Sequence, residues 1–120
     1  MDELVERLVA KVGVDRAIAE KAIGIILAFL AKEGPAAQVQ ALTEKMPGAA
    51  ALLEASSAAD SGGFGMGGIM GAGTKLMAAG LSMGQVQSVT KEVITYAREK
   101  AGEDTVGEIV AAIPGLGQFV

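Results

Sequence analysis

The chain contains the same pair of short sequence patterns twice, 67 residues apart. A Gly-Val-Asp opening at 13–15 leads to a Pro-Gly closing at 47–48, and a Gly-Leu-Ser opening at 80–82 leads to Pro-Gly at 114–115. Between these marks, apolar residues of the first copy fall on apolar residues of the second without a gap. The pairs are Ala22 and Val89, Ile26 and Val93, Leu27 and Ile94, Val39 and Val106, and Leu42 and Ile109. Such self-similarity indicates a doubled structural unit.

The first copy is predicted to contain three helices. Apolar residues recur at helical spacing over 2–12, and Gly13 then suits a left-handed helix end. Asp15 is a favourable N-cap for a second helix that runs to about Glu33. Pro35 is expected at the first position of the third helix, because its missing N–H is not needed there.

The second copy repeats this order. A helix is expected over 69–79, and the long helix after it starts at Ser82, which can form a capping box with Gln85. The last helix is predicted to begin at Glu103 or Asp104. The residues expected to face inward are Val39, Leu42, Met46, Val86, Val89, Val93, Tyr96, Ala97, Val106, Ile109, Val110 and Ile113.

The whole chain, 1–120, is predicted to be one all-α domain: a compact bundle of about seven helices with pseudo-twofold symmetry. A short extra helix is expected over 49–55. Two copies are fewer than the three that a solenoid needs, which favours a closed bundle. The predicted parts are a first unit over 1–48, a helix and glycine-rich linker over 49–68, a second unit over 69–115, and a loose apolar tail over 116–120.

The composition lacks the residue types behind much of enzyme chemistry. There is no Cys and no His among the 120 residues, which excludes disulfides, thiolate nucleophiles, His general bases and ordinary zinc sites. No carboxylate pair is spaced for general acid and base work, so neither catalysis, a cofactor nor a metal is expected. A formal charge of −4 disfavours nucleic acid. Runs such as Lys91-Glu92 and Arg98-Glu99-Lys100 indicate solvated helix faces with local ion pairs.

The segment 62–73 holds seven glycines in twelve residues and imitates several motifs. Residues 63–68 match the dinucleotide pattern GxGxxG, but the strand that this motif needs before it is not predicted. Residues 68–75 resemble a phosphate loop with its last two residues inverted, which misplaces both functional groups. The apolar stretch 64–83 could associate with a membrane, although moving the charge of Lys75, near its middle, into hydrocarbon is energetically costly. A loop that runs into a tightly packed helix is favoured.

Met66, Met70 and Met77 share one face if the helix extends that far back. Methionine fills adaptable binding surfaces, and this interpretation is favoured over a cuprous site because no Cys or His is present. An alternative is a pocket for an apolar ligand or lipid between the two units, and another is association with a membrane surface through 64–83. The predicted contact or ligand surface comprises Phe64, Met66, Met70, Met77, Ile26, Phe29 and Phe119.

The apolar spacing and the Pro-Gly marks also give the chain a family resemblance. The segments that carry it are 13–15, 22–30, Val39, Leu42, 46–49, the glycine-rich middle and 113–116. They resemble small bacterial all-helical proteins classed as domains of unknown function. The resemblance implies a bacterial all-α protein, and it carries no activity and no catalytic residues.

The favoured function is therefore non-enzymatic: protein–protein interaction or self-association, with a homo-oligomer or another protein as partner. The acidic start of the chain has no basic stretch followed by an apolar run, so no secretory signal is expected and a cytoplasmic location is predicted. The two copies differ most where Leu4, Val5 and Leu8 of the first correspond to Gly71, Ala72 and Lys75 of the second. A functional site is expected near this divergence.

Overall fold

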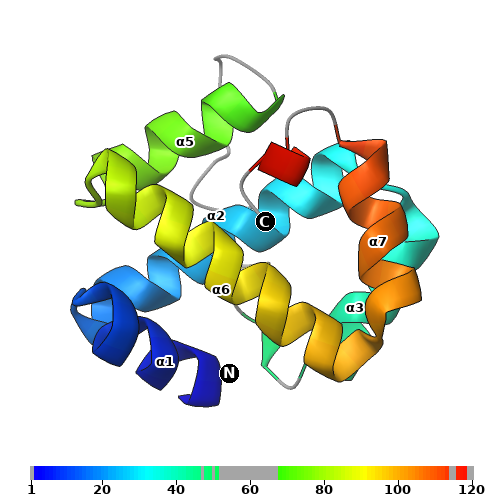
Figure 1. Ribbon diagram of the computed structural model, residues 1–120, viewed down its shortest axis with the longest axis horizontal. Helices are drawn as coiled ribbons and strands as arrows, with labels where there is room; N and C mark the ends of the chain where they lie inside the picture. Colours follow the sequence, from blue (N-terminus) through cyan, green and yellow to red (C-terminus); the bar gives the residue numbers. More distant parts are fainter. Residues whose placement is uncertain (1, 47, 50, 52–67, 114–115, 119–120) are drawn as a thin grey trace.

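A computed structural model describes the chain except for residues 1, 47, 50, 52–67, 114–115 and 119–120 (Figure 1). Within the described residues there are α-helices and one short 3-10 helix, and no strand. They are α1 (Asp2–Val12), α2 (Arg16–Glu33), α3 (Ala36–Lys45), α5 (Gly68–Ala78), α6 (Met83–Ala101), α7 (Glu103–Ala112) and η1 (Leu116–Gln118).

The all-α class is thus confirmed, with six α-helices in the described part of the chain rather than seven. The extra helix predicted over 49–55 lies mostly outside the described residues, as does most of the predicted linker.

The two long helices, α2 and α6, form the middle of the bundle (Figure 1). In the view of Figure 1, α1 and α5 lie towards the left and α3 and α7 towards the right. Helix α1 packs against both α2 and α6, and α5 also packs against both; α3 packs against α7. We call α1 to α3 unit one and α5 to α7 unit two.

Several helix boundaries recur at the interval of 67 residues, and the others differ by one residue. Adding 67 to the bounds of α3, 36–45, gives 103–112, which are the bounds of α7. The same shift carries the first residue of α2 onto the first residue of α6. The turns that precede these two helices contain Gly13 and Gly80, with φ of +83° and +114°. Both φ values are in the left-handed region that favours glycine, so glycine has the same role in the two turns.

Burial follows the same interval. Six of the seven buried residues of α2 correspond to buried residues of α6. The pairs are Ala19 and Val86, Ala22 and Val89, Ile23 and Thr90, Ile26 and Val93, Leu27 and Ile94, and Leu30 and Ala97. The inward positions Val39, Leu42 and Met46 of unit one correspond likewise to the buried Val106, Ile109 and Ile113 of unit two. Each long helix therefore presents the same pattern to the core.

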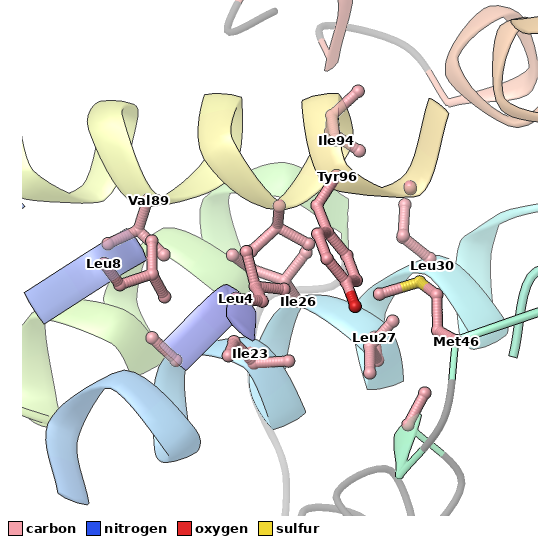
Figure 2. Packing of buried hydrophobic residues seen from close by; sticks show 14 of the residues in the cluster. Leu4, Leu8, Ile23, Ile26, Leu27, Leu30, Met46, Val89, Ile94 and Tyr96 are labelled. Atoms are coloured by element: carbon pink, nitrogen blue, oxygen red, sulfur yellow. The ribbon is translucent and has the colours of Figure 1, made fainter. Parts of the chain in front are cut away.

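The units interlock rather than stand side by side. Helix α1 of unit one lies on α6 of unit two, and α5 of unit two lies on α2 of unit one. Figure 2 shows Leu8 of α1 beside Val89 of α6, and Tyr96 reaching from α6 towards Leu27 and Met46 of unit one. The buried residues of both units form one cluster, so neither unit has a core of its own.

The helix ends confirm the predicted N-caps at Ser82 and Asp15 and correct the place of Pro35. The Gln85 N–H donates to Ser82 Oγ at 3.3 Å, and the Ser82 N–H donates to Gln85 Oε1 at 2.9 Å, which completes the capping box. Asp15 occupies the N-cap of α2, but its side chain makes no capping hydrogen bond. Pro35 is the N-cap of α3 and not its first helical residue, because its backbone is extended, with ψ of 124°.

The predicted loose tail is corrected in part. Leu116 is 1% exposed and belongs to the core, where it begins the short helix η1 that packs on α7. Burial of its side chain fixes this turn. No described helix is both long enough and apolar enough to cross a membrane.

Candidate contact surface

The seam between α1 and α6 is strongly charged. The Arg7 guanidinium donates from Nη1 to Glu99 Oε2 at 2.9 Å and from Nη2 to Glu99 Oε1 at 3.0 Å. The Lys11 ammonium lies 3.6 Å from a carboxylate oxygen of Glu92. Two further charged side chains and one ring complete this charged seam, whose members are Glu3, Arg7, Lys11, Glu92, Tyr96, Glu99 and Lys100.

Tyr96 is the anchor of the charged seam. Its ring is buried, and the cationic groups of Arg7 and Lys100 lie 5.6 and 5.5 Å from the ring centroid. A cation over an aromatic face at this distance is attracted by the ring quadrupole. The seam thus joins the two units by ion pairs on the outside and by an aromatic ring beneath them.

The partners of these charges differ from the prediction. The sequence indicated local pairs within 91–92 and 98–100, but Glu92 pairs with Lys11 and Glu99 pairs with Arg7, which are both on the other unit. The bidentate hydrogen bond lowers the pKa of Glu99 and raises the pKa of Arg7. Sequence spacing alone does not indicate an ion pair between residues that are 92 positions apart.

This pairing makes stability depend on pH in one direction. Because the pKa of Glu99 is lowered in the folded state from its ordinary value of 4.5, the paired carboxylate stabilises the fold above pH 4.5. That contribution is lost as the pH falls through the lowered pKa. We expect Glu99→Gln to reduce stability at pH 7 slightly, since exposed ion pairs contribute little, and to flatten the loss of stability below pH 4.5.

The measurement is urea unfolding followed by circular dichroism at several pH values between about 3 and 7, the range in which carboxylates titrate. Glu44→Gln, on the exposed surface of α3, is the control for removing one carboxylate. If both variants kept the acid slope of the unaltered chain, the Arg7–Glu99 pair would not be its cause.

The corresponding seam between α5 and α2 lacks most of these charges, although Lys32 and Glu33 stand where α6 has Glu99 and Lys100. Shifted by 67 residues, Arg7 corresponds to Thr74 and Lys11 to Ala78. In the other direction, Glu92 corresponds to Ile25, and Tyr96 corresponds to Phe29. Ile25 and Phe29 are partly buried and pack against the core from α2. One seam is therefore closed by ion pairs, and its counterpart has uncharged residues in place of Arg7, Lys11 and Glu92.

Two methionines are the most exposed large apolar residues among those that the structure describes. Met77, in the last turn of α5, is 49% exposed, and Met83, at the start of α6, is 68% exposed. Their counterparts in unit one are Ala10 and Arg16, which are also exposed. Val9 is the third exposed large apolar residue among those described, at 39%. We call Met77 and Met83 the methionine pair.

The structure places the predicted surface residues in different environments. Met77 is exposed, Phe29 is partly buried, and Ile26 is a core residue at 2% exposure, so a partner reaches Ile26 only if the core opens. Met70 lies in α5, but its side chain is outside what the structure describes. Phe64, Met66 and Phe119 also lie outside the described residues.

Met83 was missed as a separate contact residue, because the sequence indicated it only as the end of the stretch 64–83. In the structure Met83 is the first residue of α6, and its side chain is 68% exposed.

The interior of the described part is almost entirely apolar. Thr90 is its only buried polar side chain, and its hydroxyl donates to the Val86 carbonyl at 2.8 Å. Among the described residues there is no group of three or more acidic side chains placed to hold a metal ion. The features with chemical character are thus the charged seam and the methionine pair, both on the surface.

No protein-family model, curated protein or solved structure matches the chain. The resemblance to small bacterial helical proteins therefore stays a prediction.

Proposed function

We propose that the protein acts by protein–protein interaction, including association with itself, and that the methionine pair is the centre of its contact surface. The observation that supports this is the difference between equivalent positions of the two units. Where unit one has Ala10 and Arg16, unit two exposes Met77 and Met83. A bacterial, cytoplasmic protein without enzymatic activity is part of the same proposal.

Methionine suits this role for a physical reason. Its unbranched side chain adapts to irregular partner surfaces, and its burial removes apolar area from water. Removing apolar surface from water contributes about 25 cal/mol per Å², and the entropy lost on association offsets part of this gain. Two exposed methionines can therefore hold an apolar partner surface, while the charged seam disfavours one by the cost of desolvation.

We expect the double variant Met77→Glu/Met83→Glu to weaken self-association at least tenfold, a ratio that corresponds to about 1.4 kcal/mol. Each substitution places a charge where the unaltered chain would bury a thioether. The measurement is sedimentation velocity over a wide concentration range, in which the unaltered chain should show a mass that rises above 12.1 kDa.

The matched control is Ala10→Glu/Arg16→Glu, which introduces glutamate at the equivalent exposed positions of unit one. This control should associate like the unaltered chain. The proposal fails if the unaltered chain is a monomer throughout and binds no protein partner, or if the control weakens association as much as the methionine variant.

A further inference from the structure

The methionine side chains that the structure describes lie in two opposite environments. Met77 is 49% exposed and Met83 is 68% exposed, whereas Met46 of unit one is 1% exposed and belongs to the core. This difference has a chemical consequence, because a peroxide in solution reaches an exposed thioether and not a buried one. Folding therefore protects Met46 and leaves the methionine pair open to oxidation.

The composition directs peroxide chemistry to these thioethers. The cysteine thiolate is the other sulfur group that a peroxide oxidises, and the chain contains no cysteine. Every sulfur atom of the chain therefore belongs to one of its six methionines. Among the methionines whose side chains the structure describes, Met77 and Met83 are the exposed ones.

Met77 and Met83 flank one turn. Met77 stands one residue before the end of α5, and Met83 is the first residue of α6. Between them, the Gly80 amide donates to the Met77 carbonyl at 3.1 Å, which closes the turn. In unit one the equivalent positions hold Ala10 and Arg16, which contain no sulfur. One turn of the two therefore carries a pair of oxidisable groups.

We propose that the methionine pair is a site of reversible oxidation by hydrogen peroxide, and that oxidation releases the partner bound there. At each thioether an S–O bond forms and the O–O bond of the peroxide breaks. The sulfur loses two electrons, and the peroxide leaves as water. Two thiols of a sulfoxide reductase reverse the step, giving the thioether, a disulfide and water. The release rests on the proposed function, because it requires that the pair contacts a partner.

The release has a direct physical cause. Oxidation converts an apolar thioether into a polar sulfoxide, and a polar group that enters an apolar contact loses its hydrogen bonds to water. A partner that covers the methionine pair also excludes peroxide, so association slows the oxidation. The fold is expected to persist, because both side chains are exposed and Met46 in the core is protected.

The first measurement compares the rates at Met46, Met77 and Met83 in one chain. Dilute protein is treated with hydrogen peroxide and quenched with free methionine, and fragment-ion spectra assign each added oxygen to a residue. We expect Met77 and Met83 to react about tenfold or more faster than Met46, which reacts only when the structure opens. In urea that unfolds the chain, the three rates should agree within roughly twofold. Equal rates in the folded chain would overturn the proposal.

The second measurement is sedimentation velocity before and after oxidation of the pair. We expect the dissociation constant to rise about tenfold or more, since sulfoxides resist burial, with an unchanged circular dichroism spectrum. Treatment with a thiol-dependent sulfoxide reductase should restore association. Association that survives complete oxidation of the pair, yet is lost in Met77→Glu/Met83→Glu, would overturn the release and leave the proposed function standing.

The matched control is Met77→Leu/Met83→Leu, which keeps an apolar side chain of similar volume and removes the sulfur. It should associate like the unaltered chain and not respond to peroxide; loss of its association after peroxide would overturn the assignment of the site. Met77→Gln/Met83→Gln, with a permanent polar group, should weaken association as oxidation does and keeps the test decisive if the leucine variant does not associate. If the untreated chain binds neither itself nor another protein, the proposed function fails, while the rates at the three methionines still decide whether the pair is an oxidation site.

Discussion

Leu27→Ala is expected to lower the free energy of unfolding by about 2–5 kcal/mol, the range observed when a large aliphatic side chain is removed from a core. Leu27 is fully buried in the middle of α2 and lies in the cluster that both units share. Its counterpart in α6, Ile94, is 1% exposed. The surroundings are fixed by several helices, so the cavity cannot close by a small movement.

This loss of stability should affect the unfolding of the whole chain. Unit one and unit two share one core, so Leu27→Ala should shift a single unfolding transition and not create a second one. The measurement is urea unfolding. Circular dichroism follows the helices of both units, and the fluorescence of Tyr96 follows α6. Met83→Ala, at a position 68% exposed, is the control and should change stability by no more than about 0.5 kcal/mol. Equal effects of the two substitutions would contradict the assignment of the core.

Opposite effects are expected from alanine at two glycines. At Gly34 an added Cβ would lie 2.7 Å from the Leu30 carbonyl oxygen and within 3.3 Å of side chains from α3 and α7. That crowding should cost about 1–3 kcal/mol. At Gly107, inside α7, an added Cβ would meet nothing within 4 Å, so Gly107→Ala should stabilise by about 0.5–1 kcal/mol. Thermal unfolding of both variants measures the difference.

The equivalent position in unit two explains why Gly34 is special. Ala101 stands there as the last residue of α6, and the C-cap, Gly102 with φ of +95°, follows it. In unit one the helix ends before Gly34, whose amide donates to the Leu30 carbonyl at 2.7 Å. A stable Gly34→Ala variant would show that the end of α2 can lengthen to resemble α6.

The sequence predicted the helices well because their signals are local. The spacing of apolar residues, Gly13 and the Ser82–Gln85 capping box each act within a few residues of one another, so one sequence was enough to find them. The interval between the copies also gave the inward positions of α3 and α7. Leu116 was missed, because a short apolar turn has no periodicity that would distinguish a buried residue from a loose one.

The contact surface was harder to predict, because exposure depends on which helices meet. Helical periodicity does not show whether the face with Leu76 or the face with Met77 is buried. In the structure Leu76 is buried and Met77 is exposed. Ile26 was predicted to line a surface and lies in the core, since α2 is covered by α1, α3, α5 and α6. The partners of Glu92 and Glu99 were assigned locally for the same reason: pairing across units is a property of the assembled bundle.

The central claim is that the two units hold each other in one cooperative structure, and native-state hydrogen exchange tests it most directly. Amides that open only on global unfolding report its free energy. We predict that the slowest amides of α2 and those of α6 open with the same free energy, within about 1 kcal/mol, and converge on one opening in moderate urea. Complete exchange of one long helix while the other remains protected would contradict the account.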